Sequence, residues 1–472
     1  MKITQISANF GAKKATKQNS KNTVVTSRHY TPESVSEIKS YRAENGQVLK
    51  AKDSKNLFNV ENISNAKIGS KFLLKPTDPE FSDLTILFKP ETVLNSKKED
   101  LNYTIINEMP AFTGNIFGSI RKDERGTDFT MKSAYSDFWH KGMIDKVRPD
   151  SISSKIKSDY NFFIPSDGDG TRYRDITLLQ GGVTKPASKI PAKLGKENMS
   201  LVQNILVNFA RTSKLEGFDT IEVKPAQGSA FAFLEGLKSG QIPTDKPMVF
   251  SWGDNFSDIN ISKIILQHEK NNSGMTILTL PVDKERVKAL SAVKINNTED
   301  MEILEFTEKP KEKEVIDYYS IPEFDDNCLS AVGPYILSAQ ALQRVKEDYT
   351  NNPDSFKAAD GSFDFSRKVI GNLLIAMKNN EIKDEEGNAL KMRAYVKPEK
   401  ETWSDLGSEK DFTQSMIAIK KGGFSNLLPE IKKSISKNVD KNNNITFDVK
   451  TKEKLQKFQQ KYQINLQNAI IY

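Results

Sequence analysis

The sequence predicts an α/β fold with a mainly parallel sheet over residues 159–423. Two observations lead to this prediction. Short apolar segments typical of buried strands alternate along this region with longer segments whose apolar residues recur at helical spacing. In addition, polar residues that suit ligand binding follow several strand candidates directly, where the ligand sites of open α/β sheets lie.

The elements can be placed in order along this region. The strand candidates are "NFFIP" (161–165), "DTIEV" (219–223), "PMVFSW" (247–252), "MTILTLPV" (275–282), "MEILEFTEKP" (301–310) and "VGPYILS" (332–338). The helix candidates are residues 200–214, 229–240 and 365–380. Ser200 is predicted to be the N-cap of the first helix, whose apolar face consists of Leu201, Val202, Ile205, Leu206 and Phe209.

Three further segments flank this region. Residues 1–55 are rich in Lys, Ser, Asn and Thr and are predicted to be a basic, mostly disordered tail. Residues 56–158 contain short strand candidates broken by Pro, which predicts an accessory α+β module of unassigned role. Residues 424–472 are predicted to be a helical tail, with an apolar stripe formed by Leu455, Phe458, Tyr462, Leu466 and Ile470. We expect this stripe to pack against its own chain, and a contact in a homo-oligomer is the alternative.

Composition narrows the class of protein. The chain has 472 residues, a net charge of +7 and a single cysteine, Cys328. One cysteine excludes an internal disulfide framework and fits a reducing compartment. No apolar run reaches the roughly 20 residues that a membrane-spanning helix needs. We therefore predict a cytoplasmic protein without a membrane partner. The positive charge is compatible with phosphate-bearing ligands but too diffuse to favour nucleic acid as a partner.

A glycine-rich loop follows the first strand candidate. The segment "SDGDGTRYRDIT" and the residues after it combine small and basic side chains: Gly168, Gly170, Thr171, Arg172 and, further along, Lys185. Glycines after a buried strand let backbone N–H groups approach phosphate oxygens, and the two cations can neutralise a polyphosphate. The spacing excludes the Gly-x-x-x-x-Gly-Lys-Ser/Thr loop, and the third glycine of a dinucleotide fingerprint is absent. An ordinary Asp-Gly turn is the alternative.

Taken together and in order, five segments resemble motifs of the sugar-phosphate nucleotidyltransferase family, the sugar-nucleotide pyrophosphorylases. The loop "GDGTRYRDIT" with "TKPASKIPAKL" resembles the signature loop, and "QGSAFAF" resembles the Gly-Thr-Ala segment that faces the nucleobase. "FSWGDNFSDINISKII" is similar to the strand ending in Gly-Asp, "ILEFTEKP" to the Glu-Lys-Pro segment, and "KETWSDLGSEKDFTQSM" to the Trp-x-Asp-x-Gly segment. The resemblance covers residues 160–423.

This resemblance implies a Rossmann-like, three-layer α/β/α domain with a mixed, mainly parallel sheet. It also implies transfer of a nucleotidyl group from an NTP to a sugar 1-phosphate, which gives an NDP-sugar and pyrophosphate. The implied cofactor is Mg²⁺, with Asp254 and Asp405 as its ligands. Arg172 and Lys185 would be catalytic, acting on the charge of the reacting phosphates. The implied nucleotide-binding residues are Gly168, Gly170, Thr171, Gln227 and Gly228, and the implied sugar-phosphate-binding residues are Glu308, Lys309 and Gly333.

The sequence departs from the family pattern at three points. Asp167 stands where the family has a small residue, and its carboxylate would repel a triphosphate. The Asn of an Asn-Ala-Gly segment is absent from "SAVGPY", although Gly333 remains. Between Leu194 and Gly228 there is room for one helix and one strand only, so the sheet closes without one βα unit or with a strand from the N-terminal region. These departures keep a second hypothesis open: a protein that retains the fold and binds nucleotide sugars in a regulatory role without turnover.

Overall fold

The computed structural model describes residues 24–30, 57–58, 71–76, 78–81, 83–88, 93–96, 103–109, 134–138, 141–166, 171–180, 183–213, 215, 217–224 and 227–472. The strands are β1 (Val24–Tyr30), β2 (Leu57–Phe58), β3 (Lys71–Pro76), β4 (Ile86–Phe88), β5 (Val93–Ser96), β6 (Tyr103–Met109), β7 (Asn161–Phe163), β8 (Lys189–Leu194), β9 (Glu197–Ser200), β10 (Phe218–Lys224), β11 (Met248–Phe250), β12 (Asn255–Ser257), β13 (Ser273–Val282), β14 (Ser291–Ile295), β15 (Ile303–Glu308), β16 (Ser320–Ile321), β17 (Asn327–Leu337), β18 (Lys391–Val396), β19 (Trp403–Asp405), β20 (Ile445–Thr446), β21 (Ile464–Gln467) and β22 (Ile470–Ile471).

The α-helices are α5 (Arg174–Leu179), α6 (Leu201–Thr212), α7 (Phe231–Ser239), α8 (Ile261–Lys270), α9 (Lys313–Tyr319), α10 (Ala339–Asn351), α11 (Gly371–Lys378), α12 (Glu409–Lys420), α13 (Pro429–Asn438) and α14 (Val449–Tyr462). A π-helix, Phe365–Ile370, leads directly into α11. The predicted N-cap of α6 is confirmed: Ser200 is the N-cap, and its backbone N–H donates to Gln203 Oε1 at 2.8 Å.

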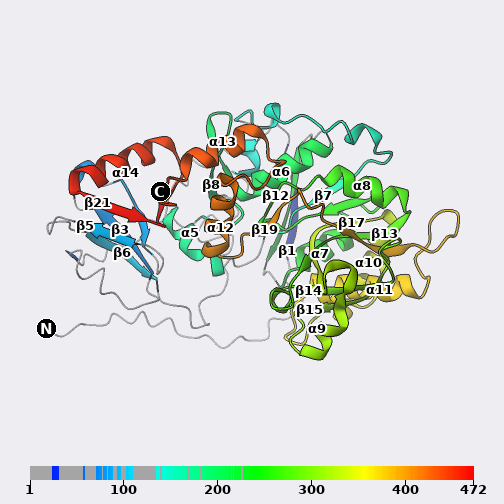
Figure 1. The fold of residues 1–472 in the computed structure, drawn as a ribbon. Coiled ribbons are helices and arrows are strands. Elements are labelled where there is room, and N and C mark those ends of the chain that lie inside the picture. The colour runs from blue at the N-terminus through cyan, green and yellow to red at the C-terminus, as the bar shows by residue number, and fades with distance from the viewer. Residues whose placement is uncertain are drawn as a thin grey trace.

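A mixed sheet lies at the centre of the region predicted to be α/β (Figure 1). The long strand β17 runs antiparallel to β11 and to β13. β7 pairs with β11 in parallel, and β18 pairs with β13 in parallel. β7, β11, β13 and β18 therefore all run in one direction, with β17 opposed to them. β14 and β15 extend the sheet beside the other half of β17.

Helices cover both faces of this sheet. Side chains of a strand alternate between faces, so Met248 and Phe250 of β11 pack into one apolar core while Val249 packs into another. The first core contains residues of α7, α10 and α11, and the second contains residues of α6, α8 and α9. The predicted three-layer α/β/α fold is thus confirmed.

A strand from the N-terminal region lies beside this domain. β1 pairs antiparallel with β10 in an unbroken register from Val24 opposite Lys224 to Tyr30 opposite Phe218. The two strands form a sheet separate from the central one. The N-terminal region therefore supplies β10 with a partner strand, but neither strand belongs to the central sheet, which closes without them. The rest of the predicted tail, residues 1–23 and 31–55, lies outside the described residues.

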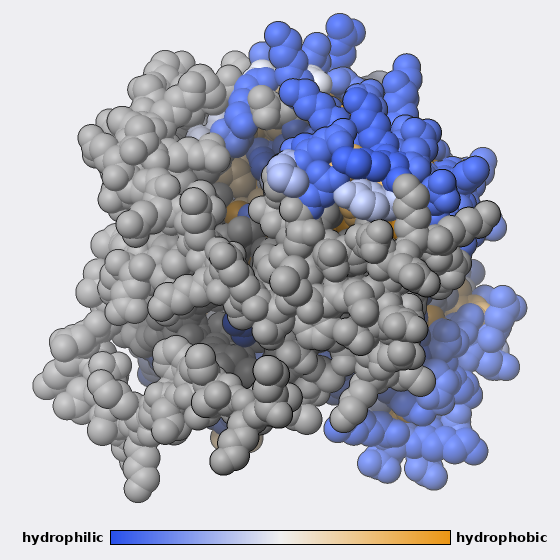
Figure 2. Space-filling model, turned by 90° about the vertical axis from the view of Figure 1, so that its left-hand side faces the viewer, coloured by the Kyte–Doolittle hydropathy of each residue, from blue (hydrophilic) through white to orange (hydrophobic). Residues whose placement is uncertain are grey.

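The two ends of the chain build one sheet together. Its strand order is β2-β6-β3-β4-β22-β20, so strands from residues 57–109 pair directly with strands from the C-terminal tail. β21 pairs with β5 in the same part of the molecule. Seen from this end, the described surface is mostly hydrophilic (Figure 2). No helix in the part of the chain that the structure describes is long and apolar enough to cross a membrane.

The C-terminal tail packs on its own chain, as expected, but its helix is shorter than the apolar stripe predicted. Leu455 and Phe458 of α14 pack into the core of the sheet formed by the chain ends. The helix stops at Tyr462 because Gln463 adopts the left-handed conformation, with φ of 51°. Leu466 belongs to β21, where buried and more exposed residues alternate as they do in a strand, and Ile470 belongs to β22, whose two residues are both buried.

Candidate active site

Loops from two parallel strands meet at the carboxyl edge of the central sheet. Because β7 and β11 are parallel neighbours, the loops that follow them leave the sheet at the same edge. Backbone hydrogen bonds keep the loops together beyond the strands: Ser251 N donates to Phe163 O at 3.0 Å, and Gly253 N donates to Pro165 O at 3.2 Å. A Cβ at Gly253 would lie 2.7 Å from Ser166 Oγ and 2.8 Å from Pro165 O, so this approach requires glycine.

The two residues predicted as metal ligands come together next to this contact. Asp254 follows Gly253 directly, and the strand after it, β12, pairs antiparallel with β19. In this short ribbon Asn255 lies opposite Asp405. The carboxylates of Asp254 and Asp405, which are far apart in the sequence, therefore lie at the same end of one ribbon.

Lys185 lies between these carboxylates. Its Nζ is 2.6 Å from Asp254 Oδ2 and 3.9 Å from Asp405 Oδ1, and its side chain is only 6% exposed. The same Nζ lies 5.6 Å from the centre of the Tyr173 ring. Arg172 reaches Asp405 Oδ2 at 3.8 Å with a side chain that is 73% exposed. The structure thus groups both predicted catalytic cations with both predicted metal ligands.

The electrostatics of this cluster favour additional positive charge. Burial raises the pKa of Asp405, the neighbouring charge of Asp254 raises it further, and Lys185 and Arg172 lower it. Two carboxylates this close repel each other, and a single buried ammonium group offsets that repulsion only in part. A cation bound by both carboxylates would offset it more fully.

The donor set fits Mg²⁺ in chemistry and number. Carboxylate oxygens are ligands that Mg²⁺ prefers, and its sites usually combine one or two carboxylates with water and substrate phosphates. Within the described ranges, no group of three or more His, Cys, Asp or Glu side chains could hold a metal ion. Asp254 and Asp405 would therefore hold Mg²⁺ as a pair that depends on a phosphate ligand.

The predicted sugar-phosphate residues form a second group. Glu308 ends β15, and Lys309 follows it with a φ of 50°, so that Nζ of Lys309 lies 3.4 Å from Glu308 Oε1. Gly333 lies in β17 with a φ of 76°, and a Cβ there would meet the Tyr335 ring at 2.8 Å. Burial raises the pKa of Tyr335, and the charge of Glu308 adds to this effect. Gly333 and Tyr335 are therefore in contact, and the charge of Glu308 acts on the Tyr335 hydroxyl.

Trp252 links this second group to the charged cluster. It lies two residues before Asp254, and its ring is edge-on to Tyr335, with ring centres 6.4 Å apart. It also packs against Phe250 and Phe365. We did not predict a role for Trp252 or Tyr335 from the sequence. An aromatic residue directly before Gly-Asp is the signal that would have drawn attention to Trp252.

The predicted nucleotide segment is tied to a distant loop. Phe363 N donates to Gln227 O at 2.7 Å, Ala230 N donates to Phe363 O at 3.2 Å, and Phe365 N donates to Ser229 Oγ at 3.1 Å. Gly228 has a φ of 109°, and a Cβ there would lie 2.3 Å from Phe363 O. The close approach seen at Gly228 is thus to the protein's own backbone, and its contact with a nucleobase stays a prediction.

Part of the glycine-rich loop lies outside the described residues, namely Asp167, Gly168 and Gly170. Thr171 begins a 3₁₀ turn, Thr171–Tyr173, that leads into α5. The roles predicted for these loop residues therefore stay predictions.

Part of this geometry lies in a region that is similar to a known protein family. Residues 207–422 match the family model described as nucleotidyl transferase. This match covers slightly less than half of the chain. The match includes Asp254, Glu308, Lys309 and Asp405 but begins within α6, after Arg172 and Lys185.

Individual relatives are similar at low identity. The chain is 24% identical over 210 residues to glucose-1-phosphate adenylyltransferase 1 of Alkalilimnicola ehrlichii. The aligned region covers 42% of this chain and 44% of that protein. It is 27% identical over 186 residues to the glucose-1-phosphate adenylyltransferase of Fusobacterium nucleatum, covering 39% of this chain and 40% of the relative. The chain thus spans less than half the length of these nucleotidyltransferase relatives.

Proposed function

We propose that this protein transfers a nucleotidyl group from an NTP to a sugar 1-phosphate and releases pyrophosphate. The observation that carries the proposal is the cluster at the carboxyl edge of the sheet, where buried Lys185 contacts both Asp254 and Asp405 and Arg172 lies beside Asp405. The match of residues 207–422 to the nucleotidyl transferase family model and the similarity to glucose-1-phosphate adenylyltransferases support the same reaction class.

The reaction needs no covalent protein intermediate. A phosphate oxygen of the sugar 1-phosphate forms a bond to the α-phosphorus of the NTP, and the bond from that phosphorus to the bridging oxygen of the β-phosphate breaks. Pyrophosphate leaves with the electron pair of the broken bond. Catalysis of this kind rests on position and on stabilisation of negative charge.

The residues of the cluster can supply both contributions. Lys185, which is buried and paired with Asp254, would hold a phosphate oxygen at the reacting centre. The exposed guanidinium of Arg172 has room to turn toward the α-phosphate and the leaving pyrophosphate. Mg²⁺ held by Asp254 and Asp405 would neutralise phosphate charge as it develops. Lys309 and Glu308 would bind the phosphate and hydroxyl groups of the sugar phosphate.

A regulatory protein that binds nucleotide sugars without turnover is the second candidate. The observation that favours it is the start of the family match at residue 207, which leaves the glycine-rich loop outside the matched region. Asp167 lies in that loop and would repel a triphosphate.

A pyrophosphate-release assay over a panel of NTPs and sugar 1-phosphates with Mg²⁺ separates the two candidates. We expect turnover that Asp254→Asn and Asp405→Asn each reduce by about 10²–10³-fold or more, because each removes a carboxylate that would hold the Mg²⁺ acting on the reacting phosphates. Asp283→Asn is the control, since Asp283 caps a turn by accepting from Glu285 N and Arg286 N at the surface. Wild-type protein that binds nucleotide sugars but is inactive with every substrate pair would establish the regulatory candidate instead.

A further inference from the structure

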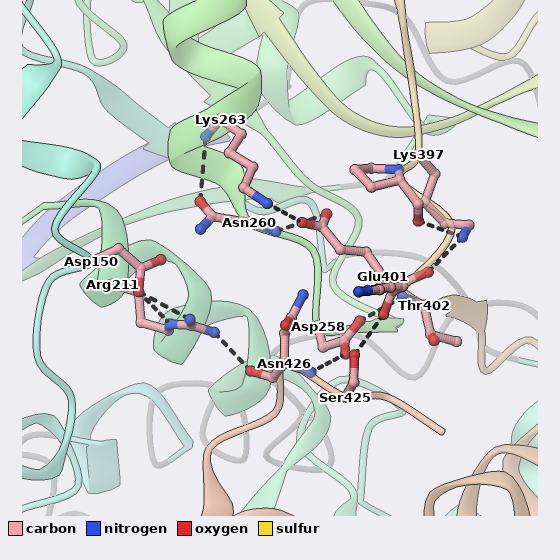
Figure 3. Close-up of polar contacts among 12 residues, drawn as sticks. Asp150, Arg211, Asp258, Asn260, Lys263, Lys397, Glu401, Thr402, Ser425 and Asn426 are labelled. Carbon is pink, nitrogen blue, oxygen red and sulfur yellow. Dashed lines mark hydrogen bonds and ion pairs between the residues drawn. The ribbon is translucent and has the colours of Figure 1, made fainter. Parts of the chain in front are cut away.

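Two buried carboxylates, Asp258 and Glu401, lie near each other in a network of polar contacts (Figure 3). Asp258 is 0% exposed and Glu401 is 2% exposed. Asp258 directly follows β12, and Glu401 lies two residues before β19. Both are therefore placed at the end of the ribbon opposite to the Asp254 and Asp405 carboxylates.

Asp258 joins three separate segments through one carboxylate. Its Oδ1 accepts a hydrogen bond from Thr402 N at 2.5 Å, and its Oδ2 accepts one from Asn426 N at 2.7 Å. Its own backbone N–H donates to Thr402 O at 3.1 Å. The residue after β12, the residue before β19 and the loop after α12 are thus fixed to one another (Figure 3).

Glu401 adds a second link on the same side. Its Oε2 accepts from Asn260 N at 3.2 Å, and its Oε1 accepts from Lys263 Nζ at 3.1 Å. The backbone of Glu401 is held as well, because Lys397 Nζ donates to Glu401 O at 2.5 Å. The segment that leads into β19 is therefore anchored to the start of α8.

The ribbon itself is too short to keep its geometry alone. It contains three paired residues on each strand, from Asn255 opposite Asp405 to Ser257 opposite Trp403. Isolated two-stranded hairpins are only marginally stable, and short ribbons depend on the structure around them. Asn204 and Asn208 of α6 support β12 by donating to Ser257 O at 3.2 Å and 3.1 Å.

The register of this ribbon determines where the two metal-binding carboxylates lie. A shift of one residue in strand pairing turns each side chain to the other face. Asn255 would then no longer face Asp405, and the Asp405 carboxylate would point away from Asp254. Because Asp258 bonds to both the N–H and the C=O of Thr402, it fixes the register at the far end of the ribbon.

Burial of the Asp258 carboxylate costs free energy of desolvation, so its hydrogen bonds to backbone donors have a structural purpose. Burial raises the pKa of Asp258, and the hydrogen bonds from Thr402 and Asn426 lower it. Carboxylates are almost never fully buried unless they are paired, since they lose hydration that backbone donors replace only in part. The hydrogen bonds that Asp258 accepts serve mainly to hold three chain segments in place.

We propose that Asp258 is a positioning residue that sets the spacing of Asp254 and Asp405 by fixing the register of β12 against β19. This inference rests on the proposed function, because it assigns the spacing a purpose in binding Mg²⁺. Asp258 contacts neither substrate nor metal in this account. It acts through the backbone of Thr402 and Asn426.

The test compares Asp258→Asn and Asp258→Ala with Asp440→Asn. Asp440 is a matched control, since its carboxylate accepts from Asn442 N at 2.8 Å and Asn444 N at 2.9 Å in the loop between α13 and α14. Asparagine at position 258 keeps one acceptor oxygen and places an amide N–H₂ against a backbone donor, so it disturbs the register less than alanine does.

Two quantities are measured for each variant. The first is the Mg²⁺ concentration that gives the half-maximal rate, and the second is amide hydrogen exchange of residues 254–258 and 402–406 without metal. For Asp258→Asn we expect about a tenfold higher Mg²⁺ requirement, as for other residues that orient metal ligands. We also expect faster exchange confined to the two segments. Asp258→Ala should show larger changes, and Asp440→Asn should show neither.

Three results would overturn the inference. The first is a Mg²⁺ requirement and exchange pattern of Asp258→Asn equal to those of wild type. The second is equal changes in Asp258→Asn and Asp440→Asn, which would mean general destabilisation. The third is faster exchange in 402–406 with an unchanged Mg²⁺ requirement. An inactive wild-type protein would refute the proposed function instead. The inference would then be tested by measuring the affinity for Mn²⁺, in the presence of a non-reacting nucleotide, in wild type and in Asp258→Asn.

Discussion

The side chain of Lys185 differs from a surface lysine in both burial and partners. Exposed ion pairs contribute little to stability because water and salt screen them. Lys185 is 6% exposed and contacts two carboxylates, so removing its charge would leave both of them uncompensated. Because the side chain of Lys185 is already ordered, binding of a phosphate oxygen to its ammonium group would cost little further side-chain entropy.

Most residues of the charged cluster could be predicted from the sequence. The buried carboxylates that hold the ribbon of β12 and β19 in place could not. Asp254 directly follows an apolar strand candidate, and Asp405 lies in a segment that resembles the family's Trp-x-Asp-x-Gly motif, so both signals are visible in the sequence. Asp258 and Glu401 have no such signal, because their partners are backbone N–H groups and one lysine from segments distant in sequence. A pattern of residue types does not reveal which backbone donors a carboxylate will meet.

Gly228 provides a prediction at the residue scale. In Gly228→Ala the new Cβ would lie 2.3 Å from Phe363 O, and the backbone has a φ of 109°. We expect a loss of about 1–3 kcal/mol of unfolding free energy from the strained backbone, with further loss from the clash. Chemical denaturation measures this change. Nucleotide affinity should fall as well, because residues 227–230 lose their bonds to the loop of Phe363.

Gly240→Ala is the control for that experiment. Gly240 has a φ of 77°, but a Cβ there would meet nothing within 4 Å. Gly240→Ala should lose only about 1–2 kcal/mol of unfolding free energy, from the left-handed backbone conformation. Its nucleotide affinity should be unchanged. Equal nucleotide affinities of the two variants would show that the contact with Phe363 does not support the nucleotide segment.

At the scale of elements, strand and helix types were easier to predict than their ends. Apolar periodicity placed α6 correctly, since its stripe continues for the whole helix and Ser200 marks its start. The periodicity of the C-terminal tail misled, because Leu466 and Ile470 continue the helical spacing after the chain has turned at Gln463. One residue in the left-handed conformation ended the helix, and glutamine gives no sequence signal for that conformation.

The contact between α14 and the N-terminal strands predicts a dependence of stability on pH. Asp78 accepts hydrogen bonds from Lys461 and Tyr462 of α14. Chiefly through Lys461, these lower its pKa to about 2. A carboxyl whose pKa is lower in the folded state stabilises above its unfolded pKa, near about 4, and this contribution disappears as the pH falls toward about 2.

Urea unfolding of wild type and Asp78→Asn across this pH range tests the dependence. We expect wild type to be more stable above about pH 5, and the difference to shrink between about pH 4 and pH 2 as Asp78 becomes protonated. A difference that stays constant throughout this range would mean that the ion pair with Lys461 does not form in solution.

At the scale of the whole molecule, the two segments that flank the α/β region in the sequence share one sheet. β22 pairs with β4, and the core beneath α14 combines Phe81, Leu84 and Ile86 with Leu455 and Phe458. The sequence predicted strands in residues 56–158 and a tail that packs on its own chain. It did not predict that the two would join, because pairing between distant strands leaves no local pattern.

The tail also reaches the region of the candidate site. Tyr173, Phe412, Phe447 and Ile470 belong to one apolar core, and Tyr173 lies under the ammonium group of Lys185. The C-terminal segment therefore packs against the residues that position Arg172 and Lys185. The division of the chain into four segments stays a prediction, since the structure shows contacts between them and not how each folds alone.

The most direct test of nucleotidyl transfer follows the α-phosphate itself. An NTP labelled with ³²P at the α position is incubated with each sugar 1-phosphate and Mg²⁺, and the labelled products are separated. We expect label in a nucleotide sugar, in equal amount to the pyrophosphate released, and only when both substrates are present. Pyrophosphate released without a sugar 1-phosphate, or label that never enters a nucleotide sugar with any substrate pair, would contradict this expectation.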